Sequence, residues 1–385
     1  MNFELNEQQS ALTDSLSRLL VDRYSFERRR ALVAAGQLHD TQTWAKLGEM
    51  GVLALTLPQA RGGFDWGARD LLPVMQSLGR ALVLEPVLAT GVLGATAVRL
   101  AGREDQQARV LPRVATGETI LAWAHDEPAA RHEPVWIETR AERKNGRWVL
   151  SGLKSPVLAA ALAGRLVVSA RVAGSSSESE GLALFLVDPK QDGVKLRNFT
   201  LVDDSSASEV TLLGAVAEPL GDPYDGSRAL RALKATLAAG IAGACADMAG
   251  GAQGAFELAM DYLRVRKQFG RAIGENQALR HRAADMLVCL EMTCSMAMAA
   301  ASAVDQPDGE EAALDLHRAK LSVARNAREV MHGAVQIHGG MGVTEECAVG
   351  HYLRRLQVLD QLFGDADAHA EHLAAELYTS CQGAK

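Results

Sequence analysis

The sequence predicts a multidomain α+β protein with an N-terminal helical domain, a middle β-barrel-like domain and a C-terminal four-helix bundle. Its 385 residues are more than one compact core usually holds. Residues 118–222 contain short apolar runs bounded by Gly, Asp, Ser and Pro, whereas the flanking regions show helical spacing. We therefore expect domains at residues 1–116, 117–223 and 224–385.

The N-terminal part is predicted to be helical from its apolar spacing. In Thr41–Met50, for example, Trp44, Leu47 and Met50 recur at three-residue intervals. Such spacing places the three side chains on one face of a helix, which can then pack on its neighbours.

The middle part is predicted to consist of β-strands. Residues Arg147–Leu150 and Gly181–Val187 are short apolar runs next to turn-forming residues. Runs of this length and setting are typical of strands in a sandwich or barrel.

The C-terminal part returns to helical spacing over longer segments. Within Asp315–Ile337, apolar side chains recur every seven residues with alanines between them, at Leu316, Val323, Ala327, Val330, Ala334 and Ile337. This stripe predicts a long helix that buries one face in a bundle.

Composition excludes several classes of protein. The net charge of -7 and the absence of a Lys/Arg stripe argue against nucleic-acid binding. No apolar run approaches the length of a membrane span, and the N-terminus lacks the features of a secretion signal. The five cysteines lack C-x-x-C spacing, which favours reduced thiols in a cytoplasmic protein.

Four segments, in order along almost the whole chain, resemble motifs of the acyl-CoA dehydrogenase family. The first, Leu57–Phe64, is similar to an L-P-x-x-x-G-G-x turn, and the second, Val202–Val210, is similar to the end of that family's middle domain. The third, Arg266–Gly270 with Gln277, resembles R-x-Q-F-G…x-Q, and the fourth, Gln336–Gly342, resembles Q-x-x-G-G-x-G.

This resemblance implies binding of FAD, in a site shared with a neighbouring subunit. An arginine fork suits the pyrophosphate, glycines let backbone N–H groups approach it, and glutamine amides can donate and accept. No glycine-rich loop precedes a helix in a βαβ unit, so a Rossmann site is excluded. The residues carried over as cofactor-binding are Arg266, Gln268, Phe269, Gln277, Gln336, Gly339 and Gly340.

The middle domain departs from the family at the positions that hold the flavin ring. Where relatives have T-E-P, this chain has Asp126-Glu127-Pro128, and where they have G-x-K-x-W-I-T it has Gly152–Leu158 with Pro-Val-Leu at the end. A carboxylate beside the electron-rich edge of a reduced flavin opposes the charge that builds up there. We expect a weakened flavin dock in this subunit.

The second departure from the family concerns the position of the catalytic base. Removal of an α-proton from the thioester needs a carboxylate within hydrogen-bond reach. Counting from Gly340 places Phe363 at the usual glutamate position, and counting back from Arg266 places Gly240 at the alternative one. Both positions therefore lack a carboxylate.

Two other carboxylates are candidates for the base. Asp365, two residues beyond Phe363, is either the base or the N-cap of a helix over Ala366–Leu377. Asp247 lies two helical turns after Gly240, on roughly the same face, and is either the base or a polar residue in the helix interior or at an interface. Asp365, His369 and His372 share one helical face, but nothing else in the sequence indicates a metal, so we expect none.

Three functions remain open. The chain is one subunit of a hetero-oligomeric acyl-CoA dehydrogenase, expected as a heterotetramer, whose dissimilar partner supplies the base; or it is a homo-oligomeric enzyme that uses Asp365; or it is a non-catalytic scaffold. The first two imply an acyl-CoA substrate, FAD and an electron acceptor of the electron-transfer-flavoprotein type, with no nucleic acid and no membrane span.

Overall fold

The computed structural model describes residues 5–307 and 310–383, and the chain divides into two compact units. The helical unit comprises residues 1–31, 68–83 and 241–385, and the sheet unit comprises residues 32–67 and 84–240. The long helix α7 (Gly226–Val265) runs through residue 240, where one unit ends and the other begins.

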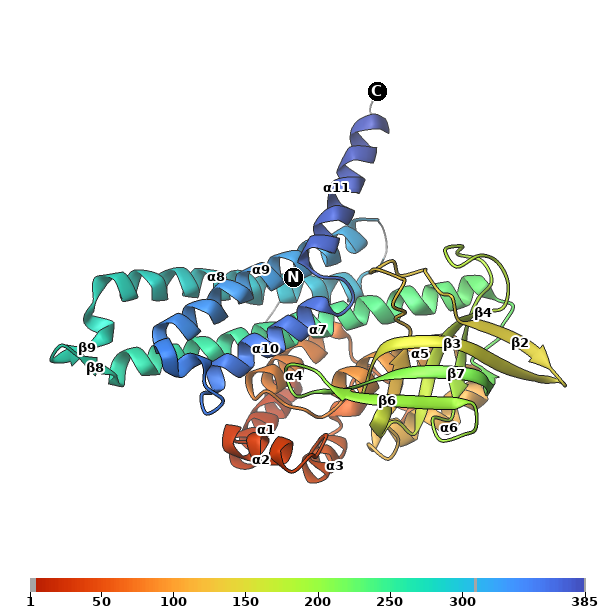
Figure 1. Cartoon of the computed structure of the whole chain (residues 1–385), viewed down its shortest axis with the longest axis horizontal. Helices are drawn as coiled ribbons and strands as arrows, with labels where there is room; N and C mark the ends of the chain where they lie inside the picture. The colour runs from red at the N-terminus through yellow and green to blue at the C-terminus, as the bar shows by residue number, and fades with distance from the viewer. Residues whose placement is uncertain (1–4, 308–309, 384–385) are drawn as a thin grey trace. The chain divides into compact units, whose positions relative to one another are not determined.

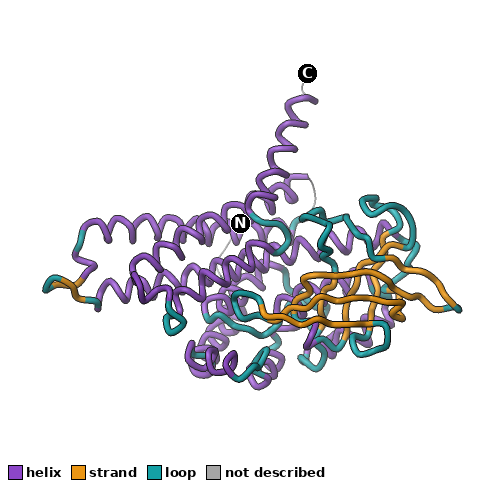
Figure 2. The backbone as a smooth tube through the Cα atoms, viewed as in Figure 1, coloured by secondary structure: helices purple, strands orange, loops and turns teal. Residues whose placement is uncertain are grey.

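The helical unit is built from long helices that run side by side (Figures 1 and 2). The predicted stripe lies in α9, and all six of its residues are buried, which confirms the prediction. The elements are α1 (Glu7–Arg23), most of α2 (Phe26–Ala34), α4 (Ala68–Arg80), α7 from residue 241, β8 (Lys267–Gln268), β9 (Arg271–Ala272), η5 (Ile273–Glu275), α8 (Gln277–Asp305), α9 (Glu310–His338), η6 (Gly339–Val343), α10 (Ala348–Gln361) and α11 (Ala366–Gly383).

The sheet unit joins short helices to a seven-stranded sheet (Figure 2). The predicted helix at Thr41–Met50 is α3, with Trp44 and Leu47 buried. The elements are α3 (Thr41–Glu49), η1 (Val52–Ala54), η2 (Gln59–Arg61), η3 (Leu88–Gly94), α5 (Ala95–Ala101), α6 (Glu104–Ala115), β1 (Leu121–Ala124), β2 (Arg140–Lys144), β3 (Arg147–Leu158), η4 (Ala160–Leu162), β4 (Arg165–Arg171), β5 (Leu182–Val187), β6 (Val194–Thr200) and β7 (Ser206–Pro219).

The sheet closes on itself. Strand β4 pairs with β2 on one side and with β5 on the other, and the path between them runs through β3 and β7. Strand β1 adds to this ring beside β4, and β6 adds to it beside β7. A ring of strands has few free edges and encloses its own core.

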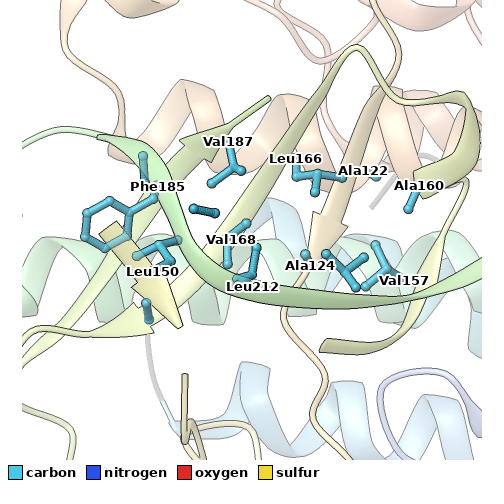
Figure 3. Packing of buried hydrophobic residues seen from close by; sticks show 14 of the residues in the cluster. Ala122, Ala124, Leu150, Val157, Ala160, Leu166, Val168, Phe185, Val187 and Leu212 are labelled. Carbon is cyan, nitrogen blue, oxygen red and sulfur yellow. The ribbon is translucent and has the colours of Figure 1, made fainter. Parts of the chain in front are cut away.

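Small and branched apolar side chains from several strands fill the interior of this sheet (Figure 3). Phe185, Leu150 and Leu212 are almost completely buried there, beside Val168 and Val157. Successive residues of a strand face opposite sides, so these positions alternate with residues that point away from the core.

The order of helical, β and helical regions is therefore as predicted, and the barrel-like middle is confirmed by the strand pairing. The proposed domain boundaries fall between α6 and β1 and between β7 and α7. They remain predictions. The two compact units divide the chain differently, since the first and last helices belong to the same unit. Among the described residues, α7 and α8 are long and apolar enough to cross a membrane by length and composition, a test that core helices also pass.

Candidate functional site

The first predicted cofactor segment forms an exposed hairpin directly after α7. Strands β8 and β9 pair antiparallel, and the turn residues Phe269 and Gly270 have φ values of 53° and 81°. Positive φ at both central residues is what a two-residue hairpin turn favours. The Phe269 ring is completely exposed.

Arg266 lies at the base of this hairpin with an exposed side chain. Its backbone N–H donates to Tyr262 O at 2.9 Å and its carbonyl accepts from Ile273 N at 2.9 Å, so the main chain is fixed. Within residues 5–307 and 310–383 its guanidinium pairs with no carboxylate, whereas the nearby Arg264 pairs with Asp261 at 2.9 Å. Arg266 is therefore available to an anionic ligand.

The second cofactor segment lies at the end of α9, and an aromatic stack links it to the first. The rings of Tyr262, on α7, and His338, the last residue of α9, have centroids 4.4 Å apart and planes at 24°. Tyr262 is one helical turn before Arg266, and His338 directly precedes Gly339. The structure thus brings together two motifs that lie about seventy residues apart in the sequence.

Gly339 and Gly340 leave their backbone open. No atom lies within 4 Å of where a Cβ would stand at either residue, and Gly339 has a φ of 63°. Gln277, the first residue of α8, and Gln336, near the end of α9, both have exposed side chains. Neutral amides, open glycine backbone and an unpaired guanidinium are a donor set that fits the diphosphate and adenine end of FAD.

The turn after α10 carries Phe363 at the usual glutamate position. Phe363 and Gly364 have φ values of 62° and 95°, so the backbone is left-handed at both. The completely buried ammonium of Lys320 donates to the carbonyl oxygens of Asp360, Leu362 and Gly364, each at 2.9 Å. A cation that binds three carbonyls at a helix C-terminus fixes this turn.

Asp365 is the N-cap of α11. Its Oδ1 accepts from Ala368 N at 2.9 Å, and its carbonyl accepts from His369 N at 3.1 Å. Its Oδ2 accepts from Gln361 Nε2 at 3.4 Å. The helix-capping interpretation accounts for this geometry, and a role for Asp365 as base remains a prediction.

The alternative base position on α7 also lacks a carboxylate, as the sequence indicates. Gly240 is buried, and Asp247, two turns further on, is buried as well. Asp247 Oδ2 accepts from Arg355 Nη2 at 2.6 Å, and Oδ1 accepts from Arg355 Nε at 3.3 Å. An ion pair of this kind holds α7 against α10.

His369 and His372 face His317 of α9. The Nδ1 atoms of His317 and His369 are 2.7 Å apart, and the rings of His317 and His372 have centroids 4.8 Å apart. Burial lowers the pKa of His317 to about 4, and burial together with Lys320 lowers the pKa of His369 to about 3. No group of three ligands that could hold a metal occurs in the part of the chain that the structure describes.

In the sheet unit, the two flavin-dock motifs meet through a buried ion pair. Lys154 Nζ donates to Glu127 Oε1 at 2.7 Å, to His125 O at 3.0 Å and to Ser169 Oγ at 3.0 Å. Glu127 Oε1 also accepts from Thr139 N at 3.0 Å and from Thr139 Oγ1 at 2.6 Å. Burial alone raises the pKa of Glu127, but Lys154 and these hydrogen bonds hold it below its usual value.

Asp126 stands beside this pair, at the position where relatives have a hydroxyl. Ser155 N donates to Asp126 O at 2.8 Å, which brings the two motifs together. Burial raises the pKa of Asp126 to about 6, against the attraction of Lys154 and His132. Val157, where relatives have isoleucine, is buried in the barrel core. The expectation of a weakened flavin dock remains a prediction, and it rests on this acid standing where relatives have a neutral hydroxyl.

Sequence reasoning missed Lys320 and the Tyr262–His338 stack. Lys320 could have been noticed, because it lies four residues after Leu316 and three before Val323, within the apolar stripe of α9. A lysine at such a position must find buried acceptors. No pattern in the sequence indicated that Tyr262 and His338 would stack.

The comparisons with known proteins agree with this fold. Residues 6–118 match the family description "Acyl-CoA dehydrogenase, N-terminal domain", and residues 230–378 match "Acyl-CoA dehydrogenase, C-terminal domain". Acyl-CoA dehydrogenase FadE12 of Mycobacterium tuberculosis is 28% identical over 328 residues, which are 81% of this chain and 81% of that protein.

Solved structures of similar fold also match almost the whole chain. The Tcur3481-Tcur3483 steroid ACAD, in a variant form, is 26% identical with a TM-score of 0.86, over 98% of this chain and 99% of that one. The ChsE4-ChsE5 complex from Mycobacterium tuberculosis has a TM-score of 0.86 at 24% identity, with the same coverage. The chain therefore belongs to the acyl-CoA dehydrogenase family, whose members are FAD-dependent oxidoreductases that act on CH–CH bonds.

Proposed function

We propose that this chain is one subunit of a hetero-oligomeric acyl-CoA dehydrogenase. In this proposal it supplies the diphosphate and adenine end of an FAD site, through Arg266, Gln268, Gln277, Gln336 and the backbone of Gly339. A dissimilar partner supplies the flavin dock and the catalytic base.

The observation that carries the proposal is the turn at Phe363. Relatives use a glutamate at this position to take the α-proton, whereas here an aromatic side chain stands there and Lys320 fixes the backbone around it. The nearest carboxylate in the sequence, Asp365, caps α11. A base must reach the α-carbon of the thioester, and neither position where relatives carry it holds an acid.

Three further observations support a division of labour between unlike subunits. The cofactor groups of the helical unit are exposed, and among the described residues Arg266 pairs with no carboxylate, as expected for a site completed by another chain. The flavin-dock motifs of the sheet unit carry Asp126 in place of a hydroxyl. Two of the similar structures bear paired names, and one is described as a complex, ChsE4-ChsE5.

The reaction is α,β-desaturation of an acyl-CoA thioester. FAD, when bound, accepts the hydride that leaves the β-carbon. The role of this chain is to hold the anionic end of that cofactor by its arginine and glycine backbone. An electron acceptor of the electron-transfer-flavoprotein type and a cytoplasmic location are part of the proposal.

The proposal is tested by purifying the chain alone and together with a co-expressed dissimilar acyl-CoA dehydrogenase subunit. We expect about one FAD per two chains in the complex, and turnover by the complex only, because each FAD site needs both subunits. Full flavin content and turnover by the chain alone would defeat the proposal. In that case Asp365→Asn decides whether Asp365 is the base: it should abolish flavin reduction by substrate while FAD stays bound.

A further inference from the structure

His338 is not among the residues predicted to bind the cofactor, yet its imidazole links the two cofactor segments. It is the last residue of α9 and directly precedes Gly339 and Gly340. Its ring stacks on Tyr262, one helical turn before Arg266, with centroids 4.4 Å apart and planes at 24°. The stack therefore holds the ring of His338 next to both segments.

A hydrogen bond decides which nitrogen of this ring carries the proton. His338 Nδ1 lies 2.9 Å from the carbonyl oxygen of Ala334, one turn earlier in α9. A carbonyl oxygen can only accept, so Nδ1 carries a proton and donates it. In the neutral ring the other nitrogen, Nε2, is then a hydrogen-bond acceptor.

This acceptor is left without a donor. Within the described part of the chain, His338 Nε2 makes no hydrogen bond. It is also not enclosed by protein, in contrast to the unpaired Nε2 of His369, which is buried. His338 is 9% exposed, so the ring is almost covered while Nε2 reaches the surface. Polar atoms of largely buried side chains normally find a partner, which here is water or a ligand.

The turn after His338 is closed on one side and open on the other. A Cβ at Gly342 would lie 2.7 Å from the carbonyl oxygen of Val335 and 3.1 Å from His338 Cβ, so η6 folds back closely on the end of α9. At Gly339 and Gly340 no atom lies within 4 Å of where a Cβ would stand. The residues that adjoin His338 in the chain are thus the open ones.

The acceptor character of Nε2 selects the part of the cofactor that it can contact. The diphosphate oxygens of FAD also accept, so they suit Arg266 and the glycine N–H groups but not Nε2. The adenosine half carries donors instead, the amine of adenine and the hydroxyls of the ribose. His338 therefore complements adenosine.

We propose that His338 is a further residue of the cofactor site, whose Nε2 accepts a hydrogen bond from the adenosine half of FAD. The donor is the adenine amine or a ribose hydroxyl. This inference rests on the proposed function, which places the adenine end of FAD at this segment. Tyr262 and the Ala334 carbonyl act through His338, since they fix its ring and its tautomer.

The test measures FAD affinity in the full complex with the dissimilar subunit, stripped of flavin and titrated with FAD by fluorescence quenching. His338→Phe keeps an aromatic ring against Tyr262 and removes Nε2. We expect the dissociation constant to rise about fivefold, as for the loss of one hydrogen bond. The matched control is His332→Phe, an exposed histidine of the same helix, which should leave the affinity unchanged. Far-UV circular dichroism confirms that both variants are folded.

Analogues of ADP identify the donor. Isothermal titration of the stripped complex compares ADP with inosine diphosphate, which lacks the amine, and with 2′-deoxy-ADP and 3′-deoxy-ADP, which each lack one hydroxyl. Wild type should bind one of these analogues about fivefold more weakly than ADP. His338→Phe should bind that analogue and ADP equally well.

Three results would overturn the inference and leave the proposed function in place. The first is an unchanged FAD dissociation constant in His338→Phe. The second is the same preference for ADP over every analogue in wild type and variant. The third is uptake of a proton on FAD binding that His338→Phe abolishes, measured in two buffers of different ionisation enthalpy, because Nε2 would then donate to the diphosphate. Turnover by the chain alone contradicts the proposed function instead, and the same titrations on that chain still decide the role of His338.

Discussion

The buried pair between Lys154 and Glu127 should make Lys154→Met strongly destabilising. The Lys154 side chain has no exposed surface and that of Glu127 is 2% exposed. Methionine fills a similar volume but leaves the carboxylate without its cation. Removing one partner of a buried pair costs about 3–5 kcal/mol.

The structure places the expected loss at the low end of this range. Glu127 keeps its hydrogen bonds from Thr139 N and Thr139 Oγ1 after the substitution, so its charge is not left without donors. We therefore expect a loss of about 3 kcal/mol in the free energy of unfolding. With a urea dependence of about 2–3 kcal/mol per molar, the midpoint falls by about 1 M.

Tryptophan fluorescence during urea unfolding measures this loss selectively. All five tryptophans of the chain, at positions 44, 66, 123, 136 and 148, belong to the sheet unit that holds the pair. The matched control is Lys144→Met, since Lys144 pairs with Glu142 at the same 2.7 Å but both side chains are more than 60% exposed. This control should not move the midpoint measurably.

Replacing both members of the buried pair gives a stricter test. The double variant Glu127→Gln with Lys154→Met should lose less than the sum of the two single variants, because it leaves no unpaired charge. Equal midpoint shifts for Lys154→Met and Lys144→Met, or strict additivity in the double variant, would refute the reasoning.

Three further predictions concern the helical unit. Asp365→Ala should cost about 1 kcal/mol by removing the cap of α11, while Asp365→Asn should be almost neutral for stability, as thermal unfolding will show. Under the proposed function, Asp365→Asn should also leave turnover of the complex unchanged. Arg266→Met should lower the FAD content of the purified complex, whereas Arg264→Met, whose side chain already pairs with Asp261, should not. The lowered pKa values of His317 and His369 mean that the unfolded chain binds more protons, so stability should fall as pH drops from about 6.5 toward 4. Melting followed by circular dichroism checks this, and the dependence should weaken in His317→Gln; no change between wild type and variant would contradict the assignment.

Local periodicity was enough to predict much of the fold. The stripe from Leu316 to Ile337 is buried in α9, and the face with Trp44 and Leu47 is buried in α3. In both cases the helix packs one apolar face against the rest of its unit. Which strands pair to close the sheet could not be predicted, since β4 meets both β2 and β5 through pairing between distant segments. Such pairing depends on register and not on local composition.

The candidate site was predictable only in part. The motif around Arg266 and the glycines at 339 and 340 could be read from the sequence, but their meeting through Tyr262 and His338 depends on how α7 and α9 pack. The alternatives for Asp365 were both compatible with its place before a helix. The three carbonyls that bind Lys320 come from a turn with positive φ, which no single residue type signals.

The central claim is that this chain alone cannot remove the α-proton of an acyl-CoA. The most direct test mixes the purified chain and added FAD with a saturated acyl-CoA under anaerobic conditions and follows the visible flavin absorbance. We predict that the flavin stays oxidised until the dissimilar subunit is added. Bleaching of the flavin by substrate with this chain alone would contradict the claim.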